Sequence, residues 1–201
     1  MPRPLRLNVC GVPQHIVQRG INRADCFYHA VDYRRYLIHL HQFSIKFDCD
    51  VHAYALMTNH VHLLVTPNSI GAISRMMHAI GTHYVSYVNR QYGRTGTLWS
   101  GRHKASLVDS EHYLFRCYRY IEQNPLRARM VVDMADYPWS SYRCNALGSF
   151  DPIVTPHSVY LDLGPTADAR RVTYRSIASE RLEDKDLEIL RIALNQQKPL
   201  R

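Results

Sequence analysis

The stretch that decides the fold is Thr58-Asn59-His60-Val61-His62-Leu63-Leu64-Val65. Side chains on a β-strand alternate between faces, so His60, His62 and Leu64 share one face and the aliphatic residues between them share the other. The aliphatic face predicts burial, and the two imidazoles are the ligands of half a metal site, because imidazole suits divalent transition metals. Chance pairing is the alternative: His39-Leu40-His41 has the same spacing on a predicted helix, where residues two apart diverge.

Periodicity extends this strand into an ordered series of elements. The expected elements are strands over 13–19, 51–57, 60–66 and 105–108, and helices over 33–47, 70–92 and 110–124. Asp32 is expected to cap the first helix, and Pro125 must end or kink the third because proline lacks a backbone donor. The order predicts an α+β fold, a ferredoxin-like or RRM-like antiparallel sheet with helices on one face. The other face is expected to be open and to carry His60 and His62.

The length of the chain suits one domain and an appendage. With 201 residues, 46% of them hydrophobic, the chain can bury a core of its own. The composition of the sequence changes after Trp139-Ser140-Ser141-Tyr142, where charged and helix-like stretches follow. We therefore expect a catalytic domain over 1–148 and a C-terminal accessory helical segment over 149–201.

The charge of the chain predicts a nucleic-acid partner. The net charge of +8 lies entirely in the first 150 residues, because residues 151–201 hold eight basic and eight acidic side chains. Only four of the 25 basic residues are lysine, and the guanidinium fork suits phosphate better than an ammonium does. A basic, arginine-rich domain indicates a nucleic-acid surface. A basic protein kept soluble by its charge is the alternative.

Other features predict a cytoplasmic protein. The five cysteines are scattered without a CxxC pair, which argues against a disulfide framework or a zinc knuckle. No apolar run approaches the roughly 18 residues of a membrane span. The basic start, residues 1–6, lacks the apolar core of a signal peptide.

A second segment, Tyr120-Ile121-Glu122-Gln123-Asn124-Pro125, adds a phenol and an amide one helical turn apart. Tyr120 could be a surface contact, and Asn124 could be an N-cap before the proline. Combined with the histidines, however, the segment indicates attack on a phosphodiester. A phenol with a pKa of about 10 needs help to attack phosphate. A divalent ion held by the two histidines and Asn124 would supply that help, and Arg116 could neutralise the phosphate. A covalent phosphotyrosine would keep the bond energy for rejoining.

Three ordered motifs, Met57–Val65, Gly96–Arg102 and Tyr120–Ala128, resemble those of the REP-associated tyrosine transposases, over about residues 8–148. These proteins are bacterial relatives of the single-tyrosine insertion-sequence transposases, which carry a His-hydrophobic-His (HUH) motif. The resemblance implies a metal-dependent single-stranded DNA endonuclease and strand transferase that cleaves near palindromic repeat hairpins through a 5′-phosphotyrosine. It implies Tyr120 as the nucleophile.

The resemblance also implies His60, His62 and Asn124 as ligands of Mg²⁺ or Mn²⁺. The expected partner is single-stranded or hairpin DNA with a short flanking tetranucleotide, bound by a monomer or a homodimer. Residues on the first strand and turn are expected to read flanking bases, and those after 93 to hold phosphate or stack on a base. Trp99 suits the core equally well. The expected nucleic-acid-binding residues are Gln14, His15, Gln18, Arg19, Asn22, Arg94, Trp99, Arg102, Lys104 and Arg116.

Three alternatives remain at this stage. A rolling-circle initiator or relaxase often uses two tyrosines, and Tyr113 lies two turns before Tyr120. A non-catalytic DNA-hairpin-binding protein or repressor on the same fold would bind DNA in a salt-sensitive way without forming an adduct. A zinc hydrolase lacks an obvious third ligand near the two histidines.

Overall fold

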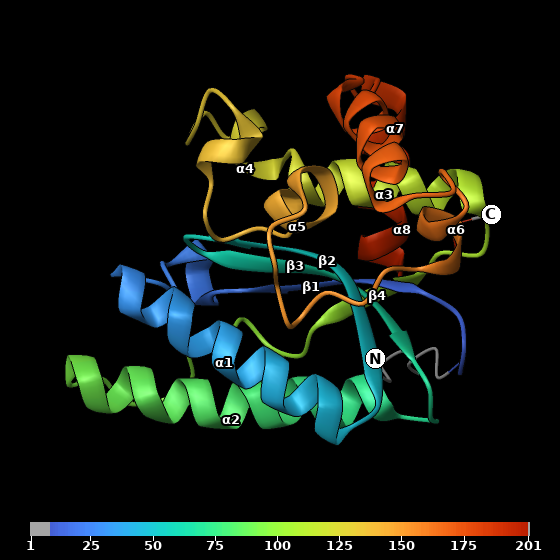
Figure 1. The fold of residues 1–201 in the computed structure, drawn as a ribbon. Helices are drawn as coiled ribbons and strands as arrows, with labels where there is room; N and C mark the ends of the chain where they lie inside the picture. The colour runs from blue at the N-terminus through green and yellow to red at the C-terminus, as the bar shows by residue number, and fades with distance from the viewer. Residues whose placement is uncertain (1–8, 201) are drawn as a thin grey trace.

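A computed structural model describes residues 9–200, so the basic start over residues 1–6 lies outside the described residues (Figure 1). Four strands form one sheet: β1 (Gln14–Arg19), β2 (Cys49–Met57), β3 (His60–Pro67) and β4 (Lys104–Leu107). The strand order is β2-β3-β1-β4, and each neighbouring pair is antiparallel. The predicted ferredoxin-like antiparallel sheet is confirmed.

Two long helices cover one face of the sheet, α1 (Ala30–Lys46) and α2 (Ala72–Tyr92) (Figure 1). Val61 and Leu63 on β3 point into this layer and are fully buried, as their alternation predicts. Large buried side chains of the layer include Ile16, Tyr36, Leu40, Leu56, Leu63, Met76, Ile80 and Tyr84.

Asp32 was expected to cap the first helix from the position before it, and this prediction was wrong. The first helix begins at Ala30, so Asp32 lies inside the first turn rather than before it. Its carboxylate accepts hydrogen bonds from the two backbone N–H groups that precede the helix, at 2.8 and 2.9 Å. It also accepts from the hydroxyls of Tyr87 at 2.7 Å and Tyr92 at 2.8 Å. Asp32 therefore satisfies the helix start from within and ties α1 to the end of α2.

The opposite face, expected to be open, is covered by a second helical layer (Figure 1). Ala53, Ala55 and Leu64 on this face pack in one apolar cluster with Leu114 and Tyr118 of the third helix. The reason lies further along the chain, because the cluster also takes in apolar residues between 160 and 200. The helices of this layer are α3 (Glu111–Glu122), α4 (Asn124–Arg127), α5 (Tyr142–Leu147), α6 (Ser158–Leu161), α7 (Ala167–Ser179) and α8 (Asp184–Gln196). Two 3-10 turns, η1 (Ile21–Arg23) and η2 (Met134–Asp136), complete the elements.

A buried carboxylate joins α3 to the helices that follow it. Glu122 is 1% exposed and accepts hydrogen bonds from Ser141 Oγ at 2.6 Å, Asn145 Nδ2 at 2.9 Å and Tyr174 Oη at 2.6 Å. Burial raises the pKa of Glu122, and the three hydrogen bonds oppose this rise without cancelling it. The network fixes the end of α3 against α5 and α7.

The last residues of the described chain reach the edge of the sheet. Leu200 forms a parallel bridge with Val108, and its N–H donates to Leu107 O at 2.8 Å. Residues 149–200 thus pack onto the sheet and α3, while a functional boundary at residue 148 stays a prediction. Within residues 9–200, none of the helices combines the length and apolar character needed to cross a bilayer.

Candidate active site

Strand β3 presents His60 and His62 toward the second helical layer, with their ring centroids 4.9 Å apart. His60 Nδ1 lies 2.6 Å from Asn59 Oδ1, and His62 Nδ1 lies 3.0 Å from Nε2 of His15 on the neighbouring strand. Because the Asn59 oxygen can only accept, the proton of His60 is on Nδ1. The second contact allows the same tautomer for His62. Each ring can therefore keep its Nε2 lone pair for another partner.

Burial keeps these imidazoles neutral. It lowers the pKa of His15 to about 3 and that of His60 to about 4, with nearby arginines adding to both shifts. Burial also lowers the pKa of His62 well below its usual value, and the two neighbouring histidines add to the effect. All three rings are neutral at pH 7, and the neutral imidazole is the form that binds a metal.

Tyr120 on α3 faces the same histidines. Its ring centroid lies 5.4 Å from that of His15 and 5.5 Å from that of His62, both in edge-on geometry. The side chain is 7% exposed, and it lines a cavity of about 490 Å³ together with His62. The structure therefore brings together a tyrosine and two histidines that lie 58 and more residues apart in the sequence.

The walls of this cavity are positive. No carboxylate is among its twelve lining residues, which come from β1, the turn after it, β3, residues 100–104, α3 and α8. Lys104 donates to Asn195 Oδ1 at 2.9 Å, which connects the wall of the sheet to α8. The cationic lining residues are Arg19, Arg23, Arg102, Lys104 and Arg191. Such a cavity favours an anion.

Two side chains support Tyr120 from behind. Asn124 Nδ2 donates to Tyr120 O at 2.8 Å, so Asn124 is the first residue of α4 and not its N-cap. Its Oδ1 takes no part in this bond. The Arg127 guanidinium lies over the Tyr120 ring, 4.6 Å from the centroid, and donates to Tyr120 O at 2.7 Å. Burial lowers the pKa of Arg127 to about 10, and Arg191 adds to this.

Two of these residues were missed from the sequence. Arg127 follows Tyr120 by two helical turns, but the proline between them hides that both side chains share one site. Arg191 belongs to a segment with no excess charge, so composition gave no signal for it.

Several residues expected to bind DNA have other surroundings. His15 is fully buried against His62 and cannot reach a base. Trp99 is 5% exposed and packs in the core with Tyr36 and Tyr84, at 6.3 and 6.2 Å between centroids. A buried ring offers no surface for base stacking, so the core reading of Trp99 fits its position.

Some of the other residues expected to bind DNA line one of the two cavities, and the rest do not. Arg116 forms an ion pair with Asp186 of α8 at 2.9 Å and is not among the residues that line the Tyr120 cavity. Arg19, Arg102 and Lys104 line the Tyr120 cavity. Gln18 lines a second cavity beside α2. Gln14, Asn22 and Arg94 are not among the residues that line either cavity.

The metal ligands inferred from the sequence stay a prediction. Among the described residues, no group of three His, Cys, Asp or Glu side chains is placed to hold a metal. His60 and His62 fit as two ligands, because the Nδ1 of each is held by a neighbour, which is typical of metal-bound histidine. A third protein ligand would have to be an amide, such as Asn124.

Comparisons with known proteins give one matching family model and similar solved structures. A family model described as transposase IS200 like matches residues 8–124. The structure of a REP-associated tyrosine transposase bound to a REP hairpin is similar, with a TM-score of 0.64 at 14% identity, covering 78% of this chain and 93% of that one. A candidate transposase from Deinococcus radiodurans R1 gives a TM-score of 0.42 at 21% identity, covering 61% of this chain and 97% of that one. No curated protein sequence matches the chain.

Proposed function

This chain belongs to the family of IS200-like transposases, and from that premise we propose that it cuts and rejoins single-stranded DNA through Tyr120. One observation carries the proposal: Tyr120 and His62 line one cavity whose five charged side chains are all cationic. A scissile phosphate would be attracted there and would meet the tyrosine. The likeness in fold to a protein bound to a REP hairpin supports a palindromic hairpin as the substrate.

The reaction we propose is a transesterification. The Tyr120 hydroxyl gives up its proton as its oxygen forms a bond to phosphorus, the bond from phosphorus to the 3′ oxygen breaks, and that oxygen takes up a proton and leaves as a 3′-hydroxyl. Arg19, Arg102 and Arg191 lie where they would neutralise the phosphate charge. The reverse attack by a 3′-hydroxyl rejoins the strand and releases the tyrosine.

The residue types of this site support a divalent metal. We propose that Nε2 of His60, Nε2 of His62 and Oδ1 of Asn124 hold Mg²⁺ or Mn²⁺. The two histidines are neutral and oriented by their Nδ1 partners, and the hydrogen bond of Asn124 to Tyr120 O uses its Nδ2 and not its Oδ1. When bound, such an ion polarises the phosphate and offsets the charge of the transition state.

A covalent-adduct assay tests the function. Single-stranded oligonucleotides with a palindromic stem and loop and randomised flanks, labelled at either end, are mixed with the protein and Mn²⁺, Mg²⁺ or a chelator. We expect a denaturant-resistant adduct that needs the metal and keeps only the 3′ label, and its DNA can be sequenced to find the cleavage site. Tight, salt-sensitive binding without an adduct would instead favour the non-catalytic hairpin-binding protein or repressor.

His15 is proposed as a positioning residue for His62. Replacing His15 by phenylalanine keeps the ring but removes the nitrogen 3.0 Å from His62 Nδ1. We expect Mn²⁺ to bind the free protein about 10- to 100-fold more weakly, measured by calorimetry, because losses of this size follow removal of such partners. His15→Gln, which keeps a hydrogen-bonding group, should recover part of the affinity. Equal Mn²⁺ affinity in the phenylalanine variant and the wild type would show that His15 does not position His62.

A further inference from the structure

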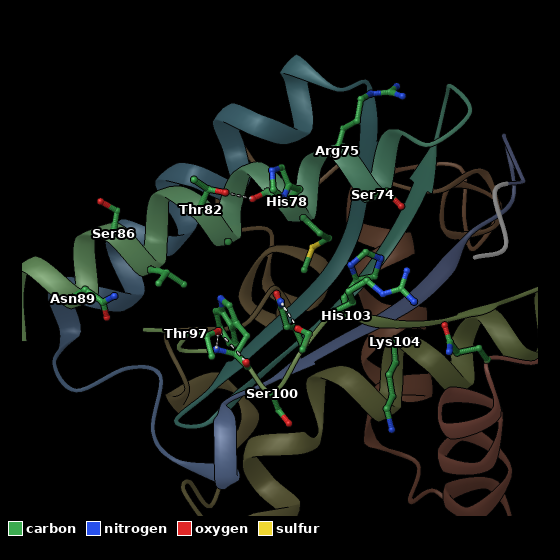
Figure 2. Close-up of a pocket in the computed structure, with 18 residues that line it drawn as sticks. Ser74, Arg75, His78, Thr82, Ser86, Asn89, Thr97, Ser100, His103 and Lys104 are labelled. Carbon is green, nitrogen blue, oxygen red and sulfur yellow. Dashed lines mark hydrogen bonds between the residues drawn. The ribbon is translucent and has the colours of Figure 1, made fainter. Parts of the chain in front are cut away.

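A second cavity, of about 1240 Å³, runs along α2 on the other side of residues 97–104. Figure 2 shows Arg75, His78, Thr82 and Ser86 following one another along α2, with Ser100 and the following residues on the opposite wall. The volume exceeds the roughly 300–1,000 Å³ of a typical small-molecule pocket. We call it the α2 groove, and its length along the helix suits a polymer.

The α2 groove carries positive charge and no negative charge. None of its eighteen lining residues is Asp or Glu, and the chain has no Asp or Glu anywhere between residues 51 and 108. Arg75 donates to the carbonyl of Ile70 and the hydroxyl of Ser69, both neutral groups. Within residues 9–200, neither Arg75, Arg102 nor Lys104 forms an ion pair. The groove is therefore complementary to a polyanion.

The α2 groove adjoins the Tyr120 cavity across one segment of the chain. Ser100, Gly101, Arg102 and Lys104 line both. Gly101 has a φ of +124°, which favours glycine, and a Cβ built there would meet no atom within 4 Å. The segment that separates the two cavities therefore has no side chain at Gly101, and an extended DNA strand would have to pass over it to reach both.

We propose that the α2 groove holds the single-stranded flank of the DNA whose scissile phosphate lies beside Tyr120. This inference rests on the proposed function and adds the path of the strand. Exposed hydroxyls of Thr82, Ser86 and Ser100 lie between the cations, and such groups contact phosphates and sugars. Trp99 is buried, so its ring offers no surface for base stacking in the groove. The groove should therefore hold the backbone with little preference for sequence.

Two carboxylates in the α2 groove test this path. His78 and Thr82 are exposed and one turn apart on α2, so His78→Glu with Thr82→Glu adds two negative charges without disturbing the core. The matched control is Val172→Glu with Ser176→Glu, which has the same spacing and charge change on exposed positions of α7, beyond the opposite face of the sheet (Figure 1).

The probe is a fluorescein-labelled oligothymidylate. It is longer than a typical single-strand binding site, which spans about 4–16 nucleotides. Binding is followed by fluorescence anisotropy at several salt concentrations. We expect the groove variant to bind about tenfold more weakly at low salt, with a shallower salt dependence. The control variant should bind within about twofold of the wild type. Near-UV circular dichroism checks that both variants fold. Equal affinity of the groove variant and the wild type would overturn the proposed path.

The adduct assay separates this inference from the proposed function. An adduct formed by the wild type, together with unchanged oligothymidylate binding in the groove variant, would overturn the α2 groove and keep the nuclease. Weaker binding by the groove variant in a protein that forms no adduct would keep the groove as a single-strand site and overturn the nuclease.

Discussion

Replacing Tyr120 by phenylalanine is expected to lower the rate of covalent DNA adduct formation at least about a thousandfold. The substitution deletes the only atom that would bond to phosphorus. The ring contacts to His15 and His62 and the stacking of Arg127 do not involve the hydroxyl. Folding and hairpin binding should therefore change little. The adduct is quantified on denaturing gels, and binding is measured on the same DNA by anisotropy.

The matched control is Tyr113→Phe. Tyr113 lies two turns earlier on α3, half-buried beneath the Arg116 guanidinium at 5.2 Å. This variant should form the adduct and rejoin strands like the wild type. Loss of only the second strand transfer in Tyr113→Phe would support the two-tyrosine relaxase mechanism, and an adduct that persists in Tyr120→Phe would disprove the assignment of the nucleophile.

The second large effect concerns stability. Glu122→Ala should lower the free energy of unfolding by about 3–5 kcal/mol, because it removes the acceptor that the buried donors of Ser141, Asn145 and Tyr174 share. Urea unfolding measures the loss. Glu111→Ala, at the exposed first position of the same helix, serves as control and should cost at most about 1 kcal/mol. A loss below that of the control would mean that the network contributes little.

The pH dependence of stability has a defined sign at Glu122. Its pKa is raised by burial, so the folded state keeps this proton to a higher pH than the unfolded chain, whose carboxyl titrates near about 4.3. The contribution of this group to stability is therefore fully present below about pH 4.3 and is lost as pH rises through the folded-state pKa. Glu122→Gln cannot titrate and should lack this component when urea unfolding is repeated across pH. Parallel curves for the variant and the wild type would contradict the raised pKa.

The first part of the fold could be predicted because its signals are local. The alternation of Val61 and Leu63 with the histidines set the buried face of β3, and helical periodicity placed α1, α2 and α3. Asp32 was misjudged because an acidic side chain can serve a helix start from outside or from within the first turn. The fold could therefore be predicted wherever it depends on residues that are close together in the sequence.

The second helical layer could not be predicted, because its contacts join residues far apart in the chain. Glu122 meets Tyr174, and Leu64 shares a cluster with Leu190, but neither pair has a periodic signal. The contacts within the candidate site could not be predicted for the same reason. Residue types identified Tyr120, His60 and His62, whereas the partnership of His15 with His62 depends on strand register. An arginine on a helix could equally face DNA or, like Arg116, an aspartate.

The position of α8 has a consequence for the order of events during synthesis. Arg191, Leu194 and Asn195 form part of the Tyr120 cavity, and Leu200 closes onto the edge strand. Chains fold from the N-terminus as they leave the ribosome. A nascent chain that has already exposed Tyr120 and both histidines thus still lacks one wall of their cavity. The complete cavity forms only after α8 has emerged, so a chain that stalls or terminates before α8 would carry the nucleophile without this wall.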